Sequence, residues 1–179
     1  MSGVKTRIGV IGHDGRAIFG NCPSSLNNKV DSILQWAHAQ NKSVGIVTTT
    51  RITHATPAGA YAHIASRDWE VYDGKVFGKK EADEGCTDAA AQLVDDHPYI
   101  NVIFGGGRQY FLPNTVDDYA GAGRKGSRID GRNLIDDWEN KMKERNLLHK
   151  FVWNADGIRS IDASKVDYAF GLLLMFKIS

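Results

Sequence analysis

The densest group of polar side chains in the sequence follows a short apolar run at residues 44–47. It contains Arg51, His54 and Thr56, with further threonines at 48–50 and 53. The Thr56 hydroxyl and the His54 ring could face a hard cation such as Mg²⁺, which takes oxygen ligands and keeps ordered waters. Arg67 could hold an anion, because its planar guanidinium donates two parallel hydrogen bonds to phosphate and stays charged. The alternative is a structural turn in which Thr56 caps a helix and His54 bonds to backbone.

The spacing of these residues sets a geometric condition on a shared site. Arg67 lies eleven residues after Thr56, which in an unbroken helix is roughly 16 Å. Both side chains can therefore serve one site only if the ion lies between them or the chain bends near Ser66.

A glycine-rich motif follows a second apolar run at residues 100–104. Its residues, Gly105 to Arg108, could cradle a phosphate with backbone N–H groups, as in a nucleotide-binding module. The motif lacks the Walker lysine and the spaced dinucleotide glycines, so a tight turn is favoured. The adjacent pairs His13-Asp14 and Asp96-His97 are predicted to be surface residues rather than metal ligands.

These groups need elements to position them, and the apolar pattern indicates an α/β fold. A helix followed by a β-branched buried run is typical of this class. We predict an α/β/α sandwich on a largely parallel sheet, with ligands bound where the strands end. The expected elements are helices at 26–40 (capped by Ser24-Ser25), from Thr56, at 87–96 and at 133–146, strands at 44–50, 100–104 and 151–153, and a surface loop at 113–131.

Composition places the chain among globular proteins and excludes several partners. Its 179 residues suit one domain or part of one, with 42% hydrophobic and 24% charged residues. The net charge of +1 gives no overall field for nucleic acid. No signal-peptide core precedes residue 8, and no apolar run is long enough to span a bilayer. Cys22 and Cys86 are either two buried thiols or a bridge that closes about 65 residues and adds roughly 4 kcal/mol of stability.

The run from Ser43 to His63, followed by Arg67-Asp68-Trp69, resembles the animal alkaline phosphatases nearly position for position. The similarity continues through 85–88, 101–108, 128–134 and 152–154, and covers roughly residues 8 to 172. The loop at 114–116 is most similar to insect members. The chain is thus expected to be part of a single alkaline phosphatase domain, an internal or truncated fragment, with 173–179 as a divergent tail.

The resemblance implies a homodimeric phosphomonoesterase that depends on zinc and magnesium and is held outside the cell by a glycosylphosphatidylinositol anchor. By position, Thr56 matches the magnesium-binding hydroxyl, His54 the polar residue beside that ion, and Arg67 the arginine on the substrate phosphate. Cys22 and Cys86 match a disulfide of animal members. Asn41-Lys42-Ser43 is then a candidate glycosylation sequon, and the Asp118 region is similar to a loop that donates a carboxylate to calcium.

The sequence also departs from the family. The Asp-Ser-Ala motif that holds the nucleophilic serine does not occur in it, and the zinc ligands have no counterpart here. We therefore expect little or no hydrolysis from this chain alone. The alternative function is that of a non-catalytic truncated isoform that binds phosphate or metal.

Overall fold

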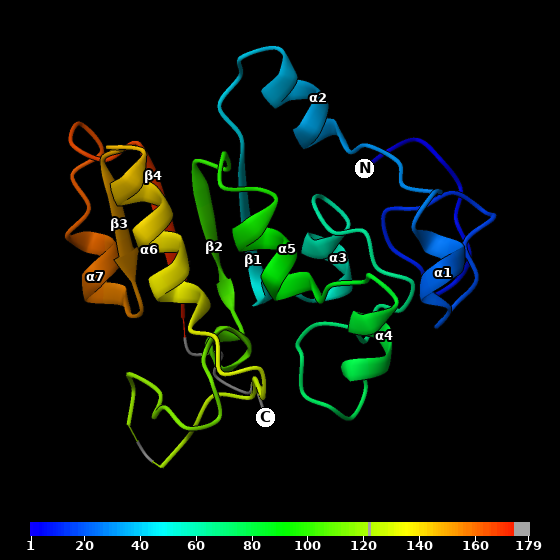
Figure 1. Ribbon diagram of the computed structural model, residues 1–179. Coiled ribbons are helices and arrows are strands. Elements are labelled where there is room, and N and C mark those ends of the chain that lie inside the picture. The colour runs from blue at the N-terminus through cyan, green and yellow to red at the C-terminus, as the bar shows by residue number, and fades with distance from the viewer. Residues whose placement is uncertain (122, 174–179) are drawn as a thin grey trace.

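The structure, a computed structural model, describes residues 1–121 and 123–173 and is built on a parallel sheet (Figure 1). The strands are β1 (Gly45–Arg51), β2 (Val102–Gly106), β3 (His149–Val152) and β4 (Tyr168–Leu172). They lie in the order β1-β2-β4-β3, and every neighbouring pair is parallel. The predicted α/β class and parallel sheet are confirmed.

The interior of the sheet is formed by apolar side chains in register. Ile46 of β1 pairs with Ile103 of β2, which pairs with Phe170 of β4. All three are buried. The sequence predicted β1, β2 and β3 within a few residues but not β4, which lies between β2 and β3.

Two helices lie over one face of the sheet, α5 (Ala89–Asp95) and α6 (Leu134–Glu144) (Figure 1). Asp88 caps α5 by accepting a hydrogen bond of 3.0 Å from the backbone of Ala91. Helix α6 buries one stripe, Leu134, Ile135, Trp138 and Met142, at the spacing of a single helix face. The helices predicted at 87–96 and 133–146 are therefore confirmed.

The prediction of one helix over 26–40 is wrong. Helix α1 (Cys22–Ser25) ends just before this segment, which contains an irregular stretch followed by α2 (Ile33–Ala39). Asn21 caps α1, so Ser24 and Ser25 lie inside that helix and cap nothing. Ser32 starts α2 with a capping box to Gln35, and this local hydrogen bonding sets the helix start more strongly than the apolar spacing does.

The helix predicted from Thr56 is also different. Helix α3 is only four residues long (Ala55–Ala58), with His54 at its N-cap position, and Thr56 makes no cap. After α3 the chain turns and becomes irregular, and Ile64 forms an antiparallel bridge with Ile11. This early end of α3 determines where Arg67 lies.

The remaining elements are short. They are α4 (Lys79–Asp83), the 3₁₀ helix η1 (Arg108–Phe111) and α7 (Ala155–Arg159). Between 113 and 131 the described residues contain only isolated bridges, such as the one that joins Pro113 to Arg128. Of the tail at 173–179, all but Leu173 lies outside the described residues. No helix in the described part of the chain has the length and apolarity needed to cross a membrane.

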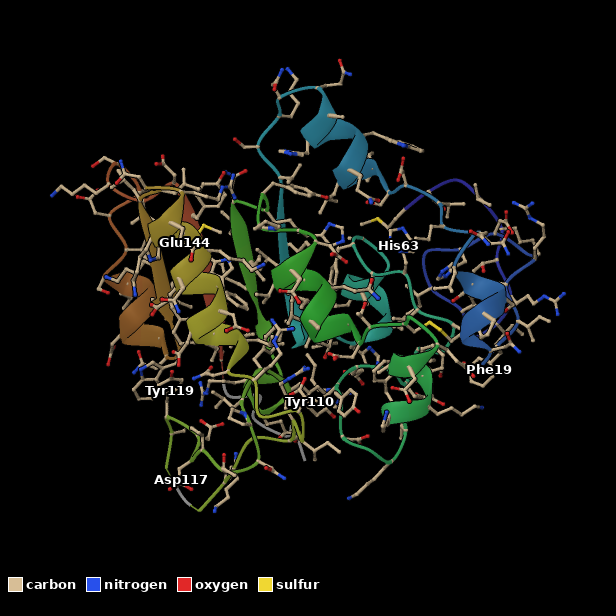
Figure 2. All side chains as sticks on the ribbon, viewed as in Figure 1. Phe19, His63, Tyr110, Asp117, Tyr119 and Glu144 are labelled. Carbon is tan, nitrogen blue, oxygen red and sulfur yellow. A yellow bond between two sulfur atoms is a disulfide. The ribbon has the colours of Figure 1, made fainter. Side chains whose placement is uncertain are left out.

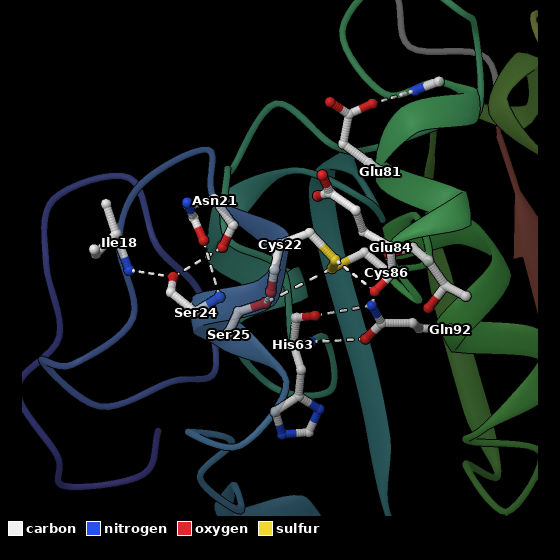
Figure 3. Close-up of a disulfide and its surroundings, with 12 residues drawn as sticks. Ile18, Asn21, Cys22, Ser24, Ser25, His63, Glu81, Glu84, Cys86 and Gln92 are labelled. Atoms are coloured by element: carbon white, nitrogen blue, oxygen red, sulfur yellow. Dashed lines mark hydrogen bonds between the residues drawn. A yellow bond between two sulfur atoms is a disulfide. The ribbon is translucent and has the colours of Figure 1, made fainter.

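A disulfide joins Cys22 of α1 to Cys86, just after α4 (Figure 3). The implied bridge is thus present, and the alternative of two free thiols is excluded. The Ser25 hydroxyl lies 3.7 Å from the Cys86 sulfur. Since the bridge spans a sequence separation of 64 residues, loop-closure entropy makes it worth about 4 kcal/mol.

Candidate functional site

The parallel strands bring their carboxyl ends to one edge, and this is the edge that holds the conspicuous polar residues. β1 ends at Arg51, β2 at Gly106 and β4 at Leu172. The Ile52 amide donates to the Gly106 carbonyl at 3.0 Å, which ties the two loops together. A cavity of about 170 Å³ opens here, lined by Arg51, Gly107, Arg108, Gln109, Asp118, Arg124 and Leu173.

Arg67 and His54 meet in space although thirteen residues separate them. The Arg67 Nη2 lies 3.4 Å from the His54 Nε2. Two contacts reverse the direction of the chain here. The Arg67 amide donates to the Gly9 carbonyl at 2.7 Å. The Gln92 side chain of α5 forms hydrogen bonds with both the backbone N–H and the carbonyl of His63 (Figure 3). The continuous helix assumed for the roughly 16 Å estimate between Thr56 and Arg67 is therefore absent, since α3 ends at Ala58.

The electrostatics of this pair favour an incoming anion. Arg67 is exposed, and within the described residues it has no carboxylate partner. A guanidinium can only donate, so the His54 Nε2 must accept and the ring proton of a neutral imidazole lies on Nδ1. That Nδ1 is buried without a hydrogen-bond partner in the described structure. The pair thus offers a free cation and a donor that lacks an acceptor.

Thr56 lies two residues after His54, on the first turn of α3, and is exposed. Among the described hydrogen bonds none involves its hydroxyl. Thr56 lines two further cavities, of about 310 and 240 Å³. The structure therefore places Thr56 two residues after His54, with Arg67 against His54, and no described hydrogen bond joins Arg67 to Thr56.

The glycine motif makes a turn rather than an open phosphate cradle. Gly107 has a φ of 87°, which favours glycine, and a Cβ added at Gly105 or Gly107 would press on Ile52 or Arg51. Arg108 is 3% exposed. Its Nε donates to Asp118 at 2.8 Å, and its Nη1 donates to the Leu172 carbonyl at 2.7 Å.

Arg108 and Asp118 are therefore already paired with each other. The Asp118 carboxylate, singled out for its similarity to a calcium loop, accepts from Arg108 in a buried pair. Arg108 also lies over the rings of Tyr119 and Trp153. Figure 2 shows Tyr119 and Tyr110 at the same end of the sheet.

The prediction that His13 and His97 lie on the surface is wrong. They are 1% and 5% exposed. Burial disfavours the charged ring and lowers the pKa of each histidine to about 4. His63 packs edge-on to His13, and burial also lowers its pKa. In residues 1–121 and 123–173, no three His, Cys, Asp or Glu side chains form a group that could hold a metal ion.

Glu70 is a site residue that the sequence reasoning missed. Its carboxylate accepts from Arg51 at 2.9 and 2.7 Å and from the Thr53 hydroxyl at 2.6 Å. Arg51 and Thr53 were visible as polar residues at a strand end, but nothing in the sequence indicated which carboxylate they meet.

The fold and this edge define an α/β protein in which polar residues, among them Arg51 and His54, gather where the strands of a parallel sheet end. The family model for alkaline phosphatase matches residues 1–177. The alkaline phosphatase of Gadus morhua is 42% identical over 96% of this chain, which spans 36% of that relative. The membrane-bound alkaline phosphatase of Bombyx mori is 41% identical over 96% of the chain, which spans 32% of it.

This chain belongs to the alkaline phosphatase family. It spans about a third of the length of the curated relatives it matches. The solved structure of alkaline phosphatase from the Antarctic bacterium TAB5 shares the fold with a TM-score of 0.60 at 23% identity, over 96% of this chain and 36% of that one.

Proposed function

We propose that this chain forms the phosphate- and magnesium-binding part of a phosphomonoesterase. The observation that supports this most strongly is an exposed Arg67 that contacts His54 and has no carboxylate partner among the described residues. Arg67 would bind two oxygens of a phosphate monoester through its planar fork. The contact with His54 would hold that fork in one orientation before the substrate arrives, which reduces the entropy lost on binding.

The residues beside Arg67 fit part of a magnesium site. The Thr56 hydroxyl would be an oxygen ligand, and the unpartnered His54 Nδ1–H would donate to an ordered oxygen next to the ion. Magnesium, when bound, would neutralise negative charge on nearby oxygens. A solved structure of a mutant TAB5 enzyme, with a TM-score of 0.59, is described as having Mg bound.

Zinc does not fit the described residues in the same way, since none of them form a group of three ligands. We therefore assign no step to zinc and no nucleophile to this chain. The zinc-activated serine mechanism of the intact family would need residues that are not identified here. Arg67 would bind and orient the phosphate, but it would not attack it.

Phosphate titration tests this proposal. Inorganic phosphate is added to the chain with magnesium present, and heat is measured for the native protein, Arg67→Ala and Thr56→Val. We expect Arg67→Ala to abolish binding and Thr56→Val to remove its dependence on magnesium. Arg159→Ala is a matched control, because Arg159 is an exposed arginine on α7. Equal phosphate affinity in the native protein and Arg67→Ala would overturn the proposal.

Hydrolysis of p-nitrophenyl phosphate tests the expected lack of turnover. With zinc and magnesium added, we expect no rate above background from the chain alone, since a bound arginine supplies no nucleophile. Zinc-dependent turnover at the rate of a full enzyme would contradict this. Binding without turnover would also support the alternative, a non-catalytic phosphate- or metal-binding isoform.

The nucleotide-binding alternative rests on Gly105–Arg108 and has a separate test. Gly106→Val should abolish nucleotide affinity on that view while Arg67→Ala should not. The burial of Arg108 against Asp118 argues against it.

The resemblance to animal alkaline phosphatases supports a proposal about the cellular setting. We propose a homodimer at the cell surface, attached by a glycosylphosphatidylinositol anchor in the intact protein, with a glycan on Asn41. Asn41 is exposed at the turn that follows α2, so its amide is accessible for glycosylation.

A further inference from the structure

Glu70 links the two chain segments that form the phosphate-binding corner. One of its carboxylate oxygens accepts from the Arg51 Nη2 at 2.7 Å, and the other accepts from the Arg51 Nε at 2.9 Å and from the Thr53 hydroxyl at 2.6 Å. Thr53 is fully buried. A carboxylate with three donors in a largely dry environment holds its partners in a narrow range of positions.

The sequence positions of Thr53 and Glu70 explain why their hydrogen bond matters for the corner. Thr53 immediately precedes His54, and Glu70 follows Arg67 by three residues. His54 is therefore next to a residue that this carboxylate holds, and Arg67 is three residues from the carboxylate itself. Neither segment is a helix or a strand at this point, so backbone ladders do not fix their separation.

The backbone around Glu70 is anchored independently. The first two amides of α5, those of Ala89 and Ala90, donate to the carbonyls of Trp69 and Glu70 at 2.9 and 3.2 Å. Trp69 is buried and packs edge-on to Phe77. The backbone of Glu70 is thus held by α5 and by the packing of Trp69. Its carboxylate in turn holds Arg51 and Thr53 at and just after the end of β1.

Glu70 also determines which arginine is open to an anion. Arg51 lies at the same edge of the sheet, where it lines the 170 Å³ cavity and covers the Tyr110 ring. The hydrogen bonds that Arg51 donates to Glu70 raise the pKa of Arg51 above its ordinary value. With Arg51 paired to Glu70, Arg67 and Arg124 are the arginines near this edge that have no carboxylate partner among the described residues, and of these two Arg67 is the one in contact with His54.

We propose that Glu70 is a positioning residue for the phosphate-binding corner: through Arg51 and Thr53 it sets the place of His54 relative to Arg67 and keeps Arg51 from competing for the anion. This inference rests on the proposed function, because it concerns the same corner.

Glu70→Gln is the first test, since it removes the charge while keeping the shape and one acceptor for Thr53. Phosphate affinity should fall roughly tenfold, the effect of losing one charge-assisted hydrogen bond. Thr53→Val is a milder second variant and should weaken binding in the same direction by less. Asp95→Asn is the matched control: Asp95 also accepts two hydrogen bonds from one arginine, Arg132, but at the opposite end of α5.

A spectroscopic readout separates positioning from general support of the fold. In nuclear magnetic resonance spectra recorded well below the unfolding temperature, Glu70→Gln should move the Arg67 side-chain and His54 ring signals before any phosphate is added. Asp95→Asn should leave both signals in place, even if it lowers the unfolding temperature equally.

The outcomes distinguish the two proposals. If Arg67→Ala abolishes phosphate binding but Glu70→Gln binds as tightly as the native chain or more tightly, the role of Glu70 is refuted and the proposed function stands. Unchanged Arg67 and His54 signals in Glu70→Gln would also refute it. If the native chain binds no phosphate, the proposed function fails and the inference with it.

Discussion

The two buried histidines make a quantitative prediction about acid. His13 and His97 have a pKa of about 4 in the folded chain, against 6.5 for a free side chain, chiefly because burial disfavours the charged ring. For His13, Lys29 and His63 lower the pKa further, while the Ile11 carbonyl raises it. As the pH falls, the rings of His13 and His97 therefore become protonated at a lower pH in the folded protein than in the unfolded chain.

The sign and size follow from linkage. Above pH 6.5 both states are neutral at these rings, so the full stability is present. Between pH 6.5 and 4 the unfolded chain is protonated first and stability is lost. Lowering the pH from about 7.5 to about 5 should cost about 2 kcal/mol for each histidine, or about 4 kcal/mol for the pair. Asp96, whose pKa is raised by burial, acts weakly in the opposite direction.

Urea unfolding followed by circular dichroism, at both pH values, measures this loss. His13→Asn and His97→Asn should each reduce the difference between the two pH values by about 2 kcal/mol, whatever they do to stability at pH 7.5. Part of the difference should remain in both variants, because the pKa of His63 is also lowered by burial. His38→Asn is the control, because His38 is exposed on α2 and stacks on Tyr99. Equal stability at the two pH values, or an undiminished loss in the double variant, would refute the reasoning.

Three further predictions concern other parts of the fold. Reduction of the Cys22–Cys86 bridge should lower the free energy of unfolding by about 4 kcal/mol, measured by urea titration with and without reductant; no change would contradict the loop-entropy argument. Asp88→Asn should cost about 2 kcal/mol, because the buried Arg128 loses one of its two carboxylate partners and keeps the pair with Asp130; no measurable loss would be inconsistent with this. Asn41→Gln should remove one glycan's mass from the chain secreted by animal cells, and an unchanged mass would exclude that site.

Periodic elements could be predicted from the sequence because local pattern and burial agree there. The apolar face of α6 has one way to be buried. For β1 the strand was predicted correctly but its burial was not, because β1 is an edge strand of the described sheet in which Ile46 is buried while Val47 is 73% exposed. β4 was missed, since Tyr168 to Leu172 alternates little. Its Gly171 is explained only by its neighbour, because a Cβ there would collide with the Phe104 ring.

The corner itself could be predicted only as a set of residue types. His54, Thr56 and Arg67 were named from their chemistry and from resemblance, and their roles stay predictions. Their arrangement depends on the early end of α3 and on contacts from Gly9 and Gln92, which are remote in sequence. The carboxylate of Glu70 was overlooked for the same reason. Hydrogen bonds between distant segments leave no periodic signal in a single sequence.

The hydrogen bond between Arg67 and Gly9 connects the proposed anion-binding corner to a stretch of chain that adds no strand to the described sheet. None of the four strands includes a residue before Gly45. A protease that removed the first dozen residues would spare the whole sheet, yet Arg67 would lose its tether. We expect such a truncated molecule to have a folded circular dichroism spectrum and yet not to bind phosphate.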